Sequence, residues 1–251
     1  MNSRSMLFRQ FTISIGLLIC LASASLADQA VSASGVKGGL VVHLGAGDGK
    51  ATAAFRVNES YIVHGLEADA VKVAAARDRL GKEGVYGPVS IRQWSSRALP
   101  YADDMVNLLV ADSLGSVPMD EDMRVLAPRG GAMIGEKKTI KPWPADMDEW
   151  PQFLHDSGNT RTANDTRVGP PRRLRWYAGP RWSRSHEFTS SVATMVTGAG
   201  RVFYVFDQGL SGITGREIPE RWTLIARDAH NGVLLWKKPL PDWGSQVWRS
   251  R

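Results

Sequence analysis

Cysteine is almost absent from this 251-residue chain, which contains only Cys20. One cysteine excludes a disulfide framework or a cysteine-based metal cluster within the chain. Long apolar runs are missing as well, because the longest, Phe11–Ala22, is well short of the roughly 20 residues that span a bilayer. No run of basic residues marks a nucleic-acid surface, although the formal net charge is +6. What remains is a globular protein with an ordinary 43% of apolar residues.

Tryptophan is nearly missing from the first part of the chain. Of the nine tryptophans, only Trp94 precedes residue 141. This uneven distribution indicates two regions with different kinds of fold. The first covers residues 36–140, a proline-broken linker follows at 141–150, and the tryptophan-rich region occupies 151–251.

The first 27 residues are typical of a secretory signal peptide. Arg4 and Arg9 precede the apolar run, and small residues lead to Ser25-Leu26-Ala27, an A-x-A-like cleavage site. Cleavage there removes the single cysteine and leaves no transmembrane span. We therefore expect an exported protein of the periplasm or cell envelope. An uncleaved membrane anchor is the alternative. A lipoprotein fits less well, because Ile19 is bulkier than the small residue expected before a lipidated cysteine.

Strands and helices alternate between residues 36 and 140, which predicts a doubly wound, Rossmann-like α/β domain with a parallel sheet. Short apolar runs predict strands at 39–44, 61–66, 89–92, 106–111 and 132–135. Helices are predicted from residue 50, over 69–80 with an end at Gly81, and over 120–126; a turn is predicted at 128–131.

A glycine-rich loop, Gly45-Ala46-Gly47-Asp48-Gly49, directly follows the first predicted strand, and Glu67 ends the second. Glycines after the first strand let a ligand approach the backbone, and an acidic residue about 20 positions further on can hold ribose hydroxyls. The order of strand, glycines, helix, strand and acid therefore predicts a nucleoside site. The alternative is a tight turn that binds nothing.

The same segment resembles the class I S-adenosylmethionine-dependent methyltransferases. The resemblance implies that S-adenosylmethionine is the cofactor, that Gly45 and Gly47 lie under its methionine part, and that Glu67 binds its ribose. Ala46 and Gly49 complete the implied cofactor loop. The matching stretches cover about 100 residues: Val41–Gly49, His64–Glu67, Leu99–Asp103 and Arg124–Gly131.

The chain departs from the family pattern at three positions. His43 replaces an acidic residue before the first glycine, Ser95 stands where an aspartate often contacts the adenine side, and Asn107 replaces an aspartate of a later strand. Each departure removes a carboxylate, which weakens the expected cofactor binding. Methyl transfer depends mostly on positioning, so no catalytic base is required. None is assigned, although His64 and Asp112 are candidate pocket residues, with structural roles as the alternative.

The tryptophan-rich region predicts antiparallel strands at 193–197, 201–206, 222–228 and 233–237. Asn231-Gly232 between the last two is a strong hairpin signal. Four such strands amount to one blade of a β-propeller. Because propellers need about 4–8 blades, we expect the chain to be an N-terminal fragment, or to complete its sheet with another chain.

Residues 224–236 of this region resemble the pyrroloquinoline-quinone (PQQ) type propeller repeat, A-x-D-x-x-T-G-x-x-x-W, with Asn231 in place of threonine. The resemblance implies that Asp228 and Gly232 fix a hairpin and that Trp236 packs between blades. Residues 150–159 resemble the lead-in of such propellers. The chain contains no residues that support a PQQ or calcium site.

Three functions are consistent with the sequence. The first is an S-adenosylmethionine-dependent methyltransferase with an unknown methyl acceptor. The second is a non-catalytic scaffold of the cell envelope, whose α/β domain has lost its cofactor and whose propeller binds protein partners. The third is a fragment of a quinone-dependent dehydrogenase, which rests on fold analogy alone.

Overall fold

The computed structural model describes residues 27–167, 169–170, 174–179, 192–210, 220–241 and 243. The predicted signal peptide lies outside this part of the chain, except for Ala27. Residues 27–34 are helical, and both Ala27 and Val31 are buried in the core. The helix of residues 27–34 thus belongs to the core of the α/β domain, ahead of the predicted start at residue 36, and the cleavage site stays a prediction.

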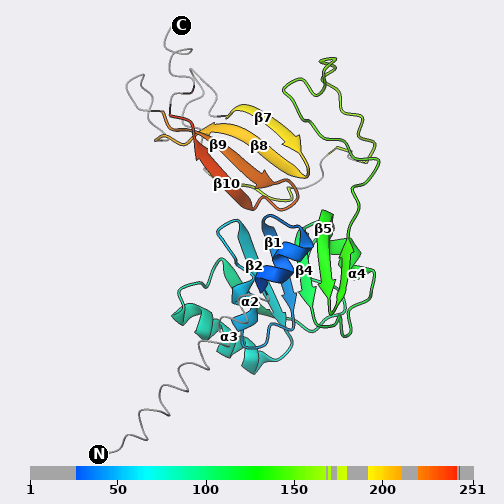
Figure 1. Cartoon of the computed structure of the whole chain (residues 1–251), viewed down its shortest axis with the longest axis vertical. Helices are drawn as coiled ribbons and strands as arrows, with labels where there is room; N and C mark the ends of the chain where they lie inside the picture. Colours follow the sequence, from blue (N-terminus) through cyan, green and yellow to red (C-terminus); the bar gives the residue numbers. More distant parts are fainter. Residues whose placement is uncertain are drawn as a thin grey trace, which may run out of the picture.

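A six-stranded sheet forms the first domain, with the strand order β3-β2-β1-β4-β5-β6 (Figure 1). The first five strands are parallel and β6 runs antiparallel to β5. Valine, isoleucine and leucine dominate the central strands, which are buried on both faces as parallel strands usually are. The predicted alternation of strands and helices is confirmed. The strands are β1 (Gly39–Leu44), β2 (Tyr61–Glu67), β3 (Val89–Gln93), β4 (Val106–Ala111), β5 (Leu126–Ile134) and β6 (Lys137–Ile140).

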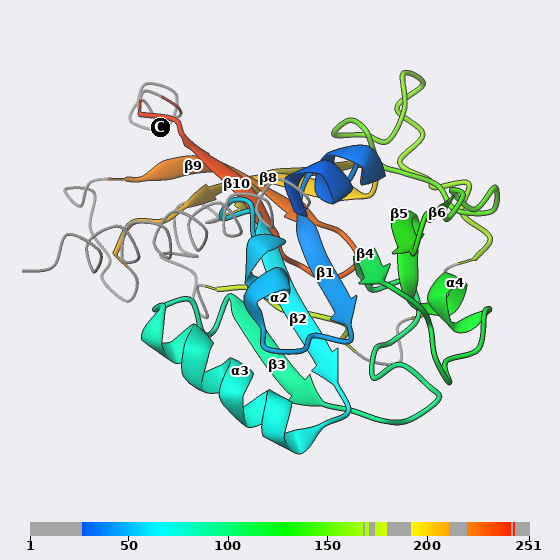
Figure 2. The same ribbon diagram turned by 60° about the horizontal axis from the view of Figure 1, so that its bottom comes forward.

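Helices cover both faces of this sheet. The helix of residues 27–34, α2 (Lys50–Ala54) and α3 (Ala70–Lys82) pack on one face, and α4 (Glu121–Val125) contributes to the core on the other (Figure 2). Asp69 caps α3, because its carboxylate accepts from the main-chain nitrogens of Val71 and Lys72. The predicted end of this helix is wrong by two residues: the helix was expected to end at Leu80, with Gly81 as the stop, but Gly81 keeps an ordinary helical backbone and the helix ends at Lys82.

The predicted turn at residues 128–131 is also wrong. These residues lie inside β5, where the register against β4 shifts between Val106 and Leu108. Arg129 adopts a positive φ of 66°, and its main-chain nitrogen donates to the carbonyl oxygen of Lys141. The proline and glycines therefore form a strand irregularity of the β-bulge type rather than a turn. The antiparallel strand β6, which follows directly, was not predicted.

The second domain is a four-stranded antiparallel sheet in the order β10-β9-β8-β7. As predicted, Asp228 fixes the last hairpin: its Oδ1 accepts from the main-chain nitrogens of His230 and Asn231, and Gly232 has φ = 75°. Trp236 is 43% exposed and packs beside Phe203. Within the described residues there is one such sheet and no closed propeller. Its strands are β7 (Val192–Gly198), β8 (Arg201–Asp207), β9 (Trp222–Asp228) and β10 (Leu234–Pro239).

The four-stranded sheet lies at the amino-terminal ends of the parallel strands, on the side opposite the glycine loop (Figure 1). Ser60, just before β2, donates its hydroxyl to the carbonyl oxygen of Leu235 in β10 at 2.5 Å. Among the described residues, no helix is long and apolar enough to cross a membrane. The same residues contain no metal-binding group of three or more histidine, cysteine or acidic side chains.

Candidate functional site

The glycine loop lies at the carboxyl-terminal ends of the parallel strands, held against the end of β2. The main-chain nitrogens of Gly45 and Ala46 both donate to the carbonyl oxygen of Leu66, at 2.9 and 3.1 Å. Gly45, Gly47 and Gly49 all have positive φ, at 76°, 55° and 81°. Only glycine adopts this conformation without strain, so the sequence pattern follows from the course of the backbone.

Glu67 at the end of β2 is 9% exposed and joins the loop directly. Its Oε2 accepts from the main-chain nitrogen of Gly47 at 2.8 Å, and its Oε1 accepts from that of Asp69 at 3.1 Å. Burial raises the pKa of this carboxyl, but these hydrogen bonds and the charge of Lys72 outweigh burial and lower it below its ordinary value. Glu67 is therefore an ionised carboxylate with lone pairs left to accept from ligand hydroxyls.

The five residues of the predicted cofactor site are together in space but differ in surroundings. A Cβ placed on Gly45 would have no atom within 4 Å, and one on Gly47 would meet only the Gly45 carbonyl oxygen at that distance. A Cβ on Gly49 would instead be 3.1 Å from the Cβ of Ala76 in α3, and Ala46 is 3% exposed. Gly45 and Gly47 thus border open space beside Glu67, whereas Ala46 and Gly49 hold the loop in place.

His43, the first departure from the family pattern, lies on β1 beneath the loop. Its Nδ1 is 2.8 Å from Oγ1 of Thr52, a residue of α2 that is fully buried. Burial lowers the pKa of His43, and the nearby carboxylates of Asp112 and Glu67 only partly oppose this. The imidazole is therefore neutral at pH 7. It offers a hydrogen-bonding nitrogen at this position, without the negative charge of the acidic residue it replaces.

The other two departures lie at opposite edges of the sheet. Ser95 is exposed in the loop after β3, on the same side as the glycine loop. Asn107 is near the start of β4, where its Oδ1 accepts from the main-chain nitrogen of Leu40 at 2.8 Å. The expectation that Asn107 weakens cofactor binding is therefore not supported, because this side chain is at the amino-terminal edge.

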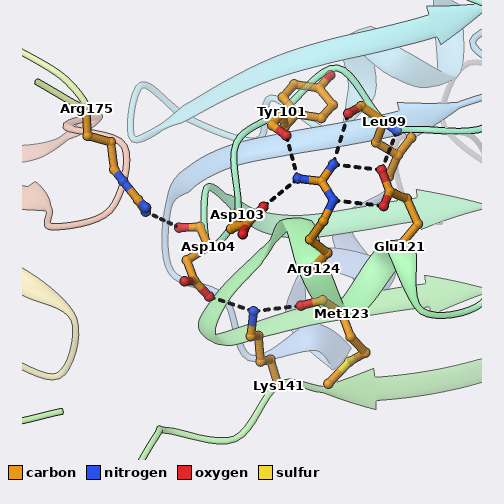
Figure 3. A network of polar contacts seen from close by, with 9 residues as sticks. All are labelled: Leu99, Tyr101, Asp103, Asp104, Glu121, Met123, Arg124, Lys141 and Arg175. Atoms are coloured by element: carbon orange, nitrogen blue, oxygen red, sulfur yellow. Dashed lines mark hydrogen bonds and ion pairs between the residues drawn. The ribbon is translucent and has the colours of Figure 1, made fainter. Parts of the chain in front are cut away.

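Two stretches of the family resemblance meet at one side chain, Arg124 of α4 (Figure 3). Its guanidinium donates to both carboxylate oxygens of Glu121, at 2.8 and 2.7 Å, and to Asp103 at 2.7 Å. It also donates to the carbonyl oxygens of Leu99 and Tyr101. Hydrogen bonds from Arg124 lower the pKa of Glu121 and that of Asp103. Arg124 thus holds the 99–103 loop against α4, a role that sequence spacing does not reveal.

His64 and Tyr101, from the same family resemblance, contact each other. The Tyr101 hydroxyl is 2.6 Å from Nδ1 of His64, and the rings meet edge to face. Burial raises the pKa of Tyr101 and lowers that of His64, so both are neutral at pH 7. Asp112 follows β4 at the carboxyl-terminal edge, near enough to influence His43. Of the two candidate pocket residues, Asp112 is thus the one whose charge reaches His43 beneath the glycine loop, whereas His64 bonds Tyr101.

Comparison with known proteins gives structural similarity alone. No protein-family model matches the sequence, and no curated protein matches it. Among solved structures, the chain is similar to a SAM-dependent methyltransferase from Aquifex aeolicus (18% identity, TM-score 0.38, covering 42% of this chain and 61% of that one). It is also similar to geranyl diphosphate C-methyltransferase from Streptomyces coelicolor A3(2), solved with S-adenosyl-L-homocysteine (18%, TM-score 0.40, 43% of each chain).

A third similar structure is the cyclase SpnF, with 24% identity, a TM-score of 0.38 and 43% of each chain covered. The chain thus spans about half the length of the solved structures it matches, from 43% to 61%. Similarity at this level says nothing about activity, and the named proteins differ in reaction. Function therefore has to be inferred from the residues of the site.

Proposed function

We propose that the α/β domain binds S-adenosylmethionine, or its product S-adenosylhomocysteine, at the carboxyl-terminal edge of the sheet, as a methyltransferase-like domain. The hydrogen bond between the Gly47 nitrogen and Glu67 is the observation that carries this proposal. It fixes an ionised carboxylate beside open space at Gly45, where the hydroxyls of a ribose can donate to it. The residues present fit the nucleoside end of the ligand.

Charge at the loop favours an adenosyl ligand over a phosphate-bearing dinucleotide. The carboxylate of Asp48 stands at the start of α2, where its Oδ1 accepts from the main-chain nitrogen of Lys50. Its Oδ2 pairs with Arg79 at 3.0 Å. A pyrophosphate at this place would be repelled by the carboxylates of Asp48 and Glu67, whereas the sulfonium of S-adenosylmethionine is a cation and would be attracted.

Chemistry at this site requires little of the chain beyond positioning. S-adenosylmethionine, when bound, supplies a methyl group on a positively charged sulfur. Glu67 holds the ribose, and the backbone of Gly45 and Gly47 leaves room for the ligand. His43 supplies no charge, so the affinity for the charged part of the ligand is lower than an acidic residue would give.

We propose that the four-stranded sheet is the first blade of a PQQ-repeat-type propeller in an exported protein. The hairpin fixed by Asp228 and Gly232, with Trp236 on the next strand, supports the propeller, and the basic, apolar and small-residue order of the first 27 residues supports export. The neutral His43 and the exposed Ser95 favour the alternative of a scaffold that binds no cofactor.

Calorimetry tests the binding proposal. S-adenosylhomocysteine is titrated into the wild-type protein, into Glu67→Ala and into Glu59→Ala; Glu59 is an exposed glutamate at the opposite edge, just before β2. We expect wild type and Glu59→Ala to bind equally and Glu67→Ala to lose at least about tenfold in affinity, the loss of one hydrogen bond to a charged group, with no binding of NAD. Absence of binding to wild type at millimolar ligand would support the scaffold instead.

A further inference from the structure

The turn between β9 and β10 inserts its polar side chains into the amino-terminal edge of the six-stranded sheet. Nδ2 of Asn231 donates to the carbonyl oxygen of Met105 at 2.8 Å and to Oδ1 of Asn107 at 2.6 Å. Nδ2 of Asn107 in turn donates to Oδ2 of Asp228 at 2.7 Å, across 121 residues of sequence. Asn107 and Asp228 are 9% and 5% exposed, so the contact is shielded from water.

Asn107 has the side chain that these partners require. Its Oδ1 accepts from Leu40 and from Asn231, while its Nδ2 donates to a carboxylate. An aspartate here would keep the acceptor, lose the donor and place a second carboxylate 2.7 Å from that of Asp228. Like charges at that distance in a buried contact repel strongly, because little water screens them.

The backbone of β1 opposite Asn107 leaves room for the Asn107 side chain. Gly39 at the start of β1 has φ = 110°, and a Cβ there would be 2.0 Å from Oδ1 of Asn107. On the other side of the turn, Gly232 has φ = 75°, and a Cβ there would be 2.5 Å from the ring of Trp176. Asn107 therefore occupies the space that Gly39 leaves free, and the ring of Trp176 occupies the space beside Gly232 of the turn.

Both asparagines are departures: Asn107 from the methyltransferase pattern and Asn231 from the propeller repeat. The two residues that depart from different patterns contact each other. From this we infer that the amino-terminal edge of the sheet is a docking surface for the Asp228–Gly232 turn. The two sheets then open and unfold as one cooperative body, and positions 107 and 231 are occupied by asparagine because of docking, independently of any ligand at the glycine loop.

The variant Asn107→Asp tests this inference in the full chain, with Asn58→Asp as the matched control. Asn58 is exposed at the same edge, and its Oδ1 accepts from the Ser60 nitrogen, which a carboxylate can also do. Amide hydrogen exchange of β9 and β10 is measured at pH 7. We expect about a tenfold or larger acceleration in Asn107→Asp and none in Asn58→Asp, because a charged buried hydrogen bond is worth about 1.5–3 kcal/mol.

A second readout separates docking from general damage. Affinity for S-adenosylhomocysteine, where binding is detected, should be the same in Asn107→Asp and wild type, because the loop is at the other edge. Unchanged exchange in β9 and β10 would overturn the inference. If Asn107→Asp does not fold, Asn231→Thr decides: threonine has no amide to donate to Met105 and Asn107, and exchange as slow as in wild type would reject the docking role.

Discussion

Gly65 of β2 lies directly beneath Ala46 of the glycine loop: a Cβ on Gly65 would be 2.7 Å from the Cβ of Ala46. The same Cβ would be 2.5 Å from Cδ1 of Ile91 and 3.1 Å from Cγ2 of Thr52. The loop therefore rests on a position without a side chain. This contact connects the packing of the sheet to the place of the candidate ligand site.

We expect Gly65→Ala to destabilise the protein by about 1–3 kcal/mol, the usual cost of overpacking a core. The control is Gly81→Ala in α3, where a Cβ meets nothing within 4 Å and the backbone is helical. Alanine there should stabilise by about 0.5–1 kcal/mol. Urea unfolding of both variants measures the difference, and equal midpoints would contradict the packing described.

Arg124→Lys should loosen the connection between α4 and the 99–103 loop. Lysine keeps the charge but cannot bond both oxygens of Glu121 while also reaching Asp103 and two carbonyl groups. We expect a loss of about 1–2 kcal/mol in unfolding free energy. Lys82→Arg is a control, because its ion pair with Asp78 is exposed and contributes little. An Arg124→Lys variant as stable as wild type would show that the network is dispensable.

Stability should fall with acid below pH 6.5. Burial lowers the pKa of His43, His64 and His230 in the folded protein, so on acidification the unfolded chain takes up protons first. The free energy of unfolding then falls as pH drops from 6.5 towards the pKa values of these histidines in the folded protein. The decrease is at most about 1.4 kcal/mol per pH unit for each histidine. Urea unfolding between pH 7.5 and 5 measures this slope. In His64→Gln the slope should be smaller, and an unchanged slope would exclude His64 as a contributor.

The contribution of His155 to stability should depend on pH in the opposite direction. This residue lies in the segment before the second sheet. The His155 side chain is 5% exposed, with Nε2 2.8 Å from Asp148 and Nδ1 3.4 Å from Asp156. The pKa of His155 is raised above 6.5, and the hydrogen bond to Asp148 is the largest cause. Its contribution to stability is complete below pH 6.5 and is lost as pH rises through the folded value.

The variant Asp148→Asn should bring the pKa of His155 down towards 6.5. An NMR titration of the imidazole protons measures it, with Asp146→Asn as the control; Asp146 pairs with Arg167 in the same segment. An equal pKa in Asp148→Asn and wild type would exclude Asp148 as the cause of the shift.

Local sequence patterns were enough to predict most strands of the two sheets and the residues of the candidate site. Buried runs of valine, isoleucine and leucine that alternate with helical patterns predict parallel strands, and glycines after a strand predict the sharp turn that needs positive φ. Strand order and spacing therefore brought Gly45, Gly47 and Glu67 together in the prediction. The hairpin at Asn231-Gly232 was predictable for the same reason, because turn chemistry is local.

Features that depend on contacts between distant segments became visible only in the folded chain. Local sequence predicted a turn at residues 128–131, but pairing with β4 and β6 holds these residues in a strand, as a bulge. Asn107 was predicted to remove a contact to the cofactor. In the structure it lies at the amino-terminal edge of the sheet, where it forms hydrogen bonds with Asp228 and Asn231. Local pattern predicts most of the strands and helices, but it misses the bulge in β5 and the strand β6. Which buried polar atom satisfies which partner is settled only when chain segments more than 100 residues apart meet.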